Sequence, residues 1–210
     1  MTYQKVKEMK NILHIISSPR TDASASRKLG NAVVEKIKEK HADYIVTVRD
    51  LAKNPPPHLD ESHINSFFTP AENRTAEQLD SIRYSDEAIK ELLDADILVV
   101  ETPMYNFTIS SLLKAYFDHI ARAGITFKSR GKGLLPEGLL KDKQAYIATS
   151  SGGVYSEGEL KTYDFGEPYV RSFLTVIGIN VVGAFRAEGQ SIIGPEAALE
   201  NAFESIAIAI

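Results

Sequence analysis

The feature that most constrains the fold is the alternation of strand-like and helix-like segments along the chain. Residues 97–100 are four consecutive apolar residues, a pattern that predicts a strand buried on both faces of a parallel sheet. A helical pattern follows this run, and the same succession recurs before and after it. Because parallel strands are joined by helical crossovers, the alternation predicts an α/β fold, with a doubly wound parallel sheet and helices on both faces.

The pattern predicts five strands and five helices. The predicted strands are residues 11–16, 44–48, 96–101, 144–149 and 180–185. The predicted helices are residues 25–40, 78–93, 109–123, 169–177 and a last helix from residue 195, whose packed end includes the apolar residues 206–210. Prolines at 55–57 break regular structure, and we expect a long loop or a short helix from there to about residue 72. The expected strand order is 2-1-3-4-5, which places strands one and three at the switch point.

Length and composition limit the class of protein. The 210 residues suit a single domain, 1–210, with a short N-terminal extension at 1–10. A net charge of −4 disfavours a nucleic-acid partner, and no apolar stretch is long enough to span a membrane. Residues 1–11 lack the apolar core of a secretory signal. The absence of cysteine excludes disulfides and thiol chemistry, and we expect a cytoplasmic protein.

Residues 17–24 form the first of three loops that we expect at the carboxyl edge of the sheet. The loop is rich in serine and precedes a predicted helix, whose free amides and dipole favour a phosphate. The alternative is that Ser24 only caps this helix. The loop has neither the Walker pattern nor the G-x-G-x-x-G pattern.

The other two loops are residues 103–108 and 150–153. The first contains a proline, two aromatic residues and an asparagine, which suit a flat and partly polar ring, and Thr108 is the predicted N-cap of the next helix. The second contains two glycines, which let backbone amides approach a ligand, although alone it equally suits a flexible turn. Together the three loops predict a mononucleotide site, for which FMN is the best fit among common cofactors.

Five stretches also carry a resemblance to a known family. They read R-D-L-A-K-N-P at 49–55, P-M-Y-N-F-T-I-S at 103–110, A-R-A-G-I-T-F at 121–127, L-P-E-G-L at 135–139 and T-S-S-G-G at 149–153. In these motifs the chain resembles the FMN-dependent NADH-azoreductases, also called NADH:quinone reductases. The resemblance implies a flavodoxin-like fold and a homodimer.

The resemblance also implies the site residues. Those implied to bind FMN are Ser18, Ser24, Ala25, Ser26, Pro103, Met104, Tyr105, Asn106, Phe107, Ser150, Ser151, Gly152 and Gly153. Those considered for an acceptor pocket are His119, Phe127 and Phe173, with Phe165 and Tyr169, for which core packing is the alternative. No catalytic acid or base and no metal site is predicted, because the flavin carries the chemistry and the histidines show no ligand pattern.

Two positions depart from the pattern of the family. Ser151 stands where many members have arginine, and Ser129, in a lengthened loop at 129–135, stands where some have tyrosine. These changes concern nucleotide preference and acceptor range rather than flavin binding.

The implied activity is two-electron transfer from NADH or NADPH, through FMN, to quinones and aromatic azo compounds in a ping-pong cycle. The alternative is a flavodoxin-type electron carrier without an NADH site of its own. A third interpretation, a flavin-free regulatory protein on the same fold, is disfavoured by the three loops together.

Overall fold

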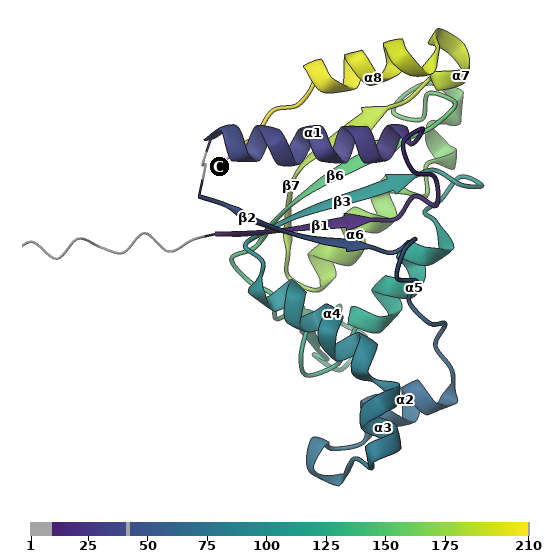
Figure 1. Ribbon diagram of the computed structural model, residues 1–210. Coiled ribbons are helices and arrows are strands. Elements are labelled where there is room, and N and C mark those ends of the chain that lie inside the picture. Colours follow the sequence, from purple (N-terminus) through teal and green to yellow (C-terminus); the bar gives the residue numbers. More distant parts are fainter. Residues whose placement is uncertain (1–9, 41–42, 210) are drawn as a thin grey trace, which may run out of the picture.

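Five parallel strands form the central sheet, in the order β2-β1-β3-β6-β7, as the sequence predicted (Figure 1). The computed structural model describes residues 10–40 and 43–209. The predicted N-terminal extension, 1–10, therefore lies outside the described residues except for Lys10. The strands are β1 (Asn11–Ile16), β2 (Ile45–Asp50), β3 (Ile97–Pro103), β6 (Gln144–Ser150) and β7 (Asn180–Ala187).

Helices cover both faces of the sheet, which confirms the doubly wound architecture. On one face lie α1 (Ala25–Lys40) and α8 (Pro195–Glu204), preceded by the short α7 (Gln190–Ile193) (Figure 1). On the other face lie α4 (Arg83–Asp94), α5 (Ser111–Ile120) and α6 (Glu167–Val176). Among the described residues, no helix is long and apolar enough to cross a membrane.

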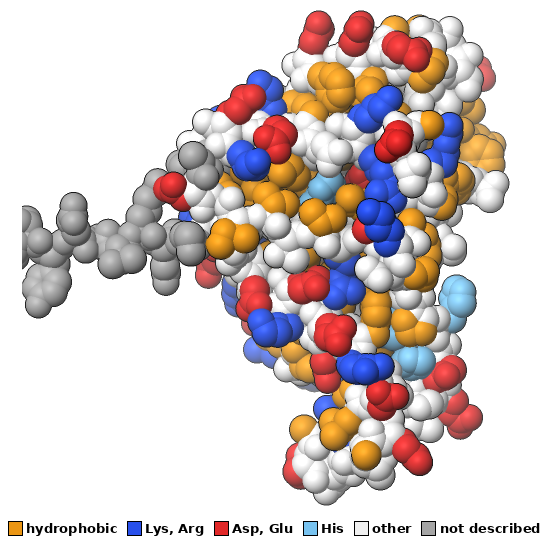
Figure 2. Space-filling view, in the orientation of Figure 1, with side chains coloured by type: hydrophobic (Ala, Val, Ile, Leu, Met, Phe, Trp, Pro, Cys, Tyr) orange, Lys and Arg blue, Asp and Glu red, His pale blue; other side chains and the backbone are white. Residues whose placement is uncertain are grey.

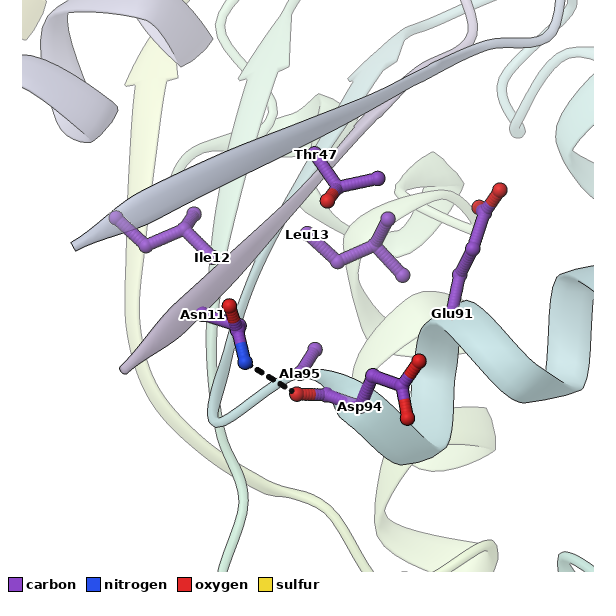
Figure 3. A pocket seen from close by; sticks show the side chains of 7 residues that line it. All are labelled: Asn11, Ile12, Leu13, Thr47, Glu91, Asp94 and Ala95. Atoms are coloured by element: carbon purple, nitrogen blue, oxygen red, sulfur yellow. Dashed lines mark hydrogen bonds between the residues drawn. The ribbon is translucent and has the colours of Figure 1, made fainter. Parts of the chain in front are cut away.

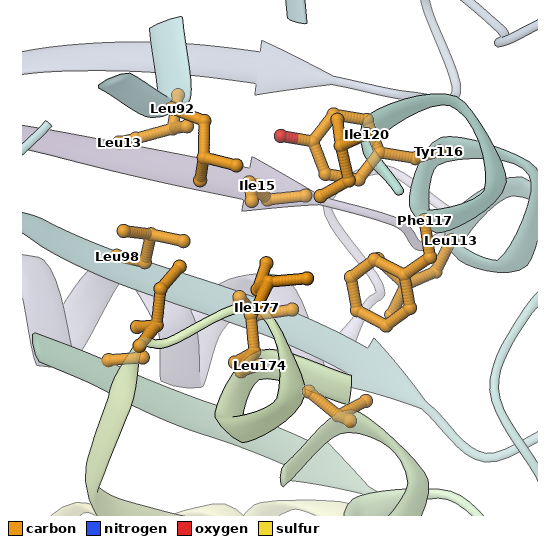
Figure 4. Close-up of a cluster of buried hydrophobic side chains, with 14 of the residues drawn as sticks. Leu13, Ile15, Leu92, Leu98, Leu113, Tyr116, Phe117, Ile120, Leu174 and Ile177 are labelled. Carbon is orange, nitrogen blue, oxygen red and sulfur yellow. The ribbon is translucent and has the colours of Figure 1, made fainter. Parts of the chain in front are cut away.

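The core lies in two layers because successive side chains of a strand point to opposite faces. Leu13 and Leu98 pack toward α4, α5 and α6, whereas Ile12 and Val99, one position away, pack toward α1 and α8. Figure 4 shows the first layer, in which Phe117 of α5 is fully buried. The interior of the sheet is therefore apolar, and a charged group placed there needs an explanation.

Several predicted boundaries differ from the structure. The predicted helix 78–93 is two helices, α3 (Ala76–Ser81) and α4, separated at Ile82. The predicted N-cap Thr108 is wrong, because Ser110 caps α5 and its Oγ accepts a hydrogen bond from the Leu113 amide at 3.2 Å. The apolar tail was expected to be the end of the last helix, but α8 ends at Glu204 and residues 206–209 are not helical. Ile208 in this tail is nevertheless buried.

The segment after the prolines and the one after α5 contain short elements that the alternation did not predict individually. The first holds α2 (Glu61–Phe68) and a 3-10 turn, η1 (Ala71–Asn73), ahead of α3; α2 and α3 lie together below the main body in Figure 1. The second holds an antiparallel pair, β4 (Phe127–Lys128) and β5 (Glu137–Gly138). A second 3-10 turn, η2 (Glu159–Tyr163), precedes α6. None of these additions changes the order of the main sheet.

Candidate functional site

The three predicted loops meet at the carboxyl edge of the sheet, where they line two adjoining pockets of about 260 and 410 Å³. The pockets share Met104, Gly152 and Ser191. The smaller pocket is lined by nine of the predicted cofactor residues: Ser18, Ser24, Ala25, Pro103, Met104, Tyr105, Ser150, Ser151 and Gly152. The larger one adds Asn106, Phe107 and Gly153. The topology thus brings the loops that follow β1, β3 and β6 to two adjoining pockets at one edge of the sheet.

The serine loop ends at the N-terminus of α1, where backbone donors remain free. Ser24 precedes the helix, and its Oγ accepts a hydrogen bond from the Arg27 amide at 3.3 Å. Within the described part of the chain, no acceptor is recorded for the amides of Ala25 and Ser26. Ser26 itself is fully buried, lines neither pocket and shares a hydrogen bond with Ser24. Capping and anion binding are therefore compatible here, because they use different donors.

Arg27 fixes the shape of this loop, a role that sequence reasoning missed. Its guanidinium donates to the Ser18 carbonyl at 2.8 Å and to the Arg20 carbonyl at 2.7 Å, and it forms an ion pair with Asp50 at 2.8 Å. The hydrogen bond and charge of Asp50 raise the pKa of Arg27, and Arg27 in turn outweighs the effect of burial and holds the pKa of Asp50 below its usual value. The positive charge of Arg27 is thus already paired with Asp50 inside the protein.

The aromatic loop turns through two residues with left-handed backbone. The amide of Tyr105 donates to the Thr108 carbonyl at 2.9 Å and that of Thr108 donates back at 3.0 Å, which encloses Asn106 and Phe107 in a tight turn. Their φ angles are 48° and 69°, conformations that asparagine tolerates and that phenylalanine rarely adopts. The surrounding structure holds this strained backbone at the mouth of the pockets, as is common at functional sites.

The ring of Phe107 has aromatic neighbours but stays 45% exposed. Its centroid lies 5.6 Å from that of Tyr163 and 6.4 Å from that of Tyr155. The amide of Phe165 donates to the Phe107 carbonyl at 3.0 Å. These contacts join the segment before α6 to the turn and place an apolar wall beside the larger pocket.

The Gly-Gly loop is held by the start of α7. The Ser191 amide donates to the Gly152 carbonyl at 2.9 Å, and the Gln190 side chain donates to the Ser151 carbonyl at 3.2 Å. A Cβ at Gly152 would stand 2.9 Å from Ser191 Oγ, so a side chain there would require Ser191 to shift. Among the described residues, no hydrogen bond is recorded from the amides of Gly152 and Gly153. Gln190 and Ser191 were absent from the sequence prediction, and no motif distinguishes them.

The three residues predicted for an acceptor pocket lie outside the lining of these two pockets. Phe173 stacks on Phe117 with centroids 4.1 Å apart. His119 is fully buried, its Nε2 lies 2.9 Å from the Pro57 carbonyl, and burial lowers its pKa. Phe127 is half-buried in β4. Of the two further candidates, Phe165 is 55% exposed next to the turn, and Tyr169 packs against the core.

A further pocket lies at the opposite edge of the sheet, between the start of β1 and the end of α4 (Figure 3). Asn11 Nδ2 already donates across it to the Asp94 carbonyl at 3.0 Å. Ligands of open α/β sheets bind at the carboxyl ends of the strands, so this pocket is the weaker candidate. Within residues 10–40 and 43–209, no group of three or more acidic or histidine side chains could hold a metal ion.

Two basic side chains stand beside the phosphate end of the site. Arg20 and Lys28 line a neighbouring pocket that shares Arg20, Ala25, Gln190 and Ser191 with the smaller site pocket. Figure 2 shows that acidic and basic side chains are otherwise intermixed over the face in view. The local charge around the serine loop therefore suits an anion, although the chain as a whole is acidic.

Comparison with known proteins agrees with this geometry. The sequence profile of the flavodoxin-like fold family matches residues 10–208. An FMN-dependent NADH:quinone oxidoreductase of Herminiimonas arsenicoxydans is 50% identical over 181 residues, which cover 86% of this chain and 88% of that protein. The FMN-dependent NADH:quinone oxidoreductase 6 of Burkholderia lata is 45% identical over 204 residues, which cover 96% and 100% of the two chains.

Solved structures give the same relationship. An azoreductase from Bacillus anthracis superposes with a TM-score of 0.81 at 30% identity and covers 93% of this chain and 98% of its own. An FMN-dependent NADH-azoreductase from the same organism, in complex with FMN, has a TM-score of 0.82 at 25% identity and covers 93% and 95%. With most of both chains aligned in each comparison, the protein belongs to the flavodoxin-like family of FMN-dependent NADH:quinone oxidoreductases and azoreductases.

Proposed function

We propose that the protein is an FMN-dependent NADH:quinone oxidoreductase that also reduces aromatic azo compounds to amines. The names of its relatives support this activity. The observation that carries the proposal is the pair of adjoining pockets at the carboxyl edge, lined by three loops with complementary chemistry. One end offers hydroxyls and helix amides, the middle offers aromatic side chains, and the far side offers free glycine amides.

The residues present fit FMN. The amides of Ala25 and Ser26, which have no recorded acceptor in the described chain, suit the phosphate together with Ser18 and Ser24. The absence of side chains at Gly152 and Gly153 leaves their amides accessible to the polar edge of a ring. All thirteen residues predicted from sequence are proposed to bind the cofactor, with Gln190 and Ser191 added by the structure.

FMN, when bound, would supply the redox chemistry of a two-electron transfer from NADH or NADPH to a quinone or an azo compound. The protein's part is to bind and orient. The loop at 103–108 would hold the ring region, where its two aromatic side chains line the pockets. The amides of Gly152 and Gly153 are placed to stabilise negative charge at the ring's polar edge. His119, Phe127 and Phe173 remain proposals for the acceptor side.

We also propose a homodimer that closes over this site. Apolar side chains around the larger pocket are exposed in the single chain, including Phe107, Tyr163, Phe165 and Ile192. An exposed apolar rim of this kind is typical of a protein–protein interface. The twofold arrangement would cover the rim and complete each acceptor pocket with the neighbouring subunit.

The proposed setting is a single-domain cytoplasmic enzyme acting on small molecules, without a nucleic-acid or membrane partner. The acidic net charge and the absence of cysteine support it.

The test is the visible absorption spectrum of the protein with FMN, before and after anaerobic addition of NADH, followed by a quinone. We expect bound FMN to bleach promptly with NADH and to regain its colour with the quinone, and free FMN under the same conditions to react far more slowly. Bound FMN that stays oxidised would indicate the electron carrier instead. A protein that binds no FMN would overturn the cofactor assignment.

A further inference from the structure

A carboxyl group is buried in the sheet directly beneath the serine loop. Glu101 lies on β3, two residues before Pro103, and is 0% exposed. Among the described residues, neither carboxyl oxygen has a well-formed hydrogen bond, although the backbone amides of Ser17 and Ser18 face the carboxyl. A carboxylate in such surroundings is destabilised relative to the neutral acid. The proposed redox cycle leaves this group without a role.

No titratable group packed against Glu101 in the described structure forms an ion pair with its carboxyl. On β1, His14 Nε2 lies 3.9 Å from Glu101 Oε2, too far for a hydrogen bond, and burial lowers the pKa of His14 to about 4, so the imidazole is neutral. On α1, Arg27 is paired with Asp50 at the end of β2. On β6, the residue in register with Glu101 is Ala148, which has no titratable group. Burial raises the pKa of Glu101 to about 8, against the opposing effect of Arg27.

Helix α1 packs closely on this pair. A Cβ at Gly30 would stand 2.8 Å from His14 Nε2 and 3.2 Å from Glu101 Oε2, so the helix reaches this position only with a glycine. The backbone of α1 therefore covers this side of the carboxyl. The start of the same helix bears the free amides of the phosphate end.

The serine loop connects Glu101 to the phosphate end of the site. Ser17 Oγ donates to the Glu101 carbonyl at 2.8 Å, and the amides of Ser17 and Ser18 face its carboxyl and partly offset the effect of burial on its pKa. Ser18 also lines the smaller pocket. A phosphate bound at Ser18 and Ser24 would therefore place further negative charge next to Glu101, and like charges favour the protonated acid.

We propose that the phosphate end of the site binds the flavin phosphate tightly only while the buried carboxyl of Glu101 is neutral, so that a protein molecule in which Glu101 is ionised takes up one proton from solvent when the phosphate binds. The inference rests on the proposed function, because it needs FMN in the pocket. It makes Glu101 a positioning residue that acts through the serine loop.

The experiment measures FMN affinity between pH 6.5 and 9.5 by quenching of flavin fluorescence. For the unmodified protein we expect affinity to fall above about pH 8, by up to tenfold for each pH unit, because the free protein then loses a proton that the complex must regain. Glu101→Gln keeps the neutral, isosteric group, so its affinity should match at pH 7 and not fall in this way. Glu39→Gln, at the far end of α1, is the control and should follow the unmodified protein.

Two further measurements test whether protons are taken up when FMN binds and whether this uptake requires the phosphate. Calorimetry in two buffers of different ionisation enthalpy should show proton uptake rising toward one per FMN at pH 9 in the unmodified protein. Riboflavin, which lacks the phosphate, should bind without this uptake. Identical pH profiles for the unmodified protein and Glu101→Gln, or equal uptake with riboflavin, would overturn the inference while leaving FMN binding intact. Absence of FMN binding at every pH would instead overturn the proposed function.

Discussion

Glu101→Gln should change how the stability of the flavin-free protein depends on pH. Glu101 is fully buried and holds its proton up to about pH 8, whereas in the unfolded chain its pKa returns to about 4.5. Between these two values the folded state binds one proton more than the unfolded state. Stability therefore falls as pH rises through this window, by about 1.4 kcal/mol for each pH unit. Glutamine has no proton to lose.

The measurable quantity is the difference in unfolding free energy between the two proteins. From pH 6 to pH 8 the unmodified protein should lose about 2 kcal/mol relative to Glu101→Gln, since these two pH units lie within the window and the slope lessens as the pH approaches the pKa of the folded state. Below pH 4.5 the difference should become constant, because both states then hold the proton. The other titrating groups contribute equally to both proteins and cancel, apart from His14, which is close enough to be coupled.

Urea titrations at intervals of half a pH unit, followed by far-UV circular dichroism, provide the free energies. Riboflavin and FMN must be removed first, because a bound ligand would add its own linkage. A difference that stays constant from pH 6 to pH 8 would refute the reasoning, since it would show that the Glu101 carboxyl titrates in its ordinary range. Glu39→Gln, an exposed change, should follow the unmodified protein throughout.

The remaining predictions concern the loops themselves. Arg27→Ala removes an ion pair and two hydrogen bonds to loop carbonyls, so we expect a loss of about 3 kcal/mol in urea and at least tenfold weaker FMN binding; unchanged FMN affinity would contradict its role in the loop. Gly152→Ala places a Cβ 2.9 Å from Ser191 Oγ. Because Ser191 is exposed and can shift, stability should change by less than about 1 kcal/mol. FMN affinity should nevertheless fall about tenfold, measured by fluorescence titration, and undiminished binding would argue against a role for this amide.

The strand order and the three loops were predictable because both follow from local patterns. Apolar runs at 97–100 and 145–148 indicate strands buried on both faces, and right-handed helical crossovers then leave only a few strand orders, of which 2-1-3-4-5 is a common one. Once the adjacency is known, the loops at the carboxyl ends must converge. The motifs and the topology thus locate the pockets without any knowledge of side-chain contacts.

The start of α5 was not predictable in the same way. Thr108 and Ser110 are both good capping residues, and the sequence does not choose between them. The choice is made by the turn at Asn106 and Phe107, whose left-handed backbone pairs Tyr105 with Thr108 and delays the helix. Phenylalanine carries no signal for such a turn.

The roles of Arg27 and Gln190 also depend on tertiary structure. Arg27 donates to the Ser18 carbonyl in the serine loop, and Gln190 donates to the Ser151 carbonyl in a loop far away in the sequence. Neither side chain belongs to a motif. The same holds for Glu101 and His14, whose proximity follows from the pairing of β1 with β3 and from the period-2 alternation that directs both side chains toward α1.

The charges beneath the serine loop explain why the protonation state of Glu101 can affect the binding of an anion at the other end of this loop. The guanidinium of Arg27 is bound to Asp50 and to two loop carbonyls, so its charge is largely compensated. A phosphate at this end would therefore meet the partial positive charges of amides, hydroxyls and the start of α1, together with the exposed side chains of Arg20 and Lys28, whose charges solvent screens. Against such modest attraction, an ionised Glu101 would be a substantial repulsion, because the buried surroundings screen it poorly. Neutralising that carboxyl removes the repulsion without adding a further cation to the phosphate site.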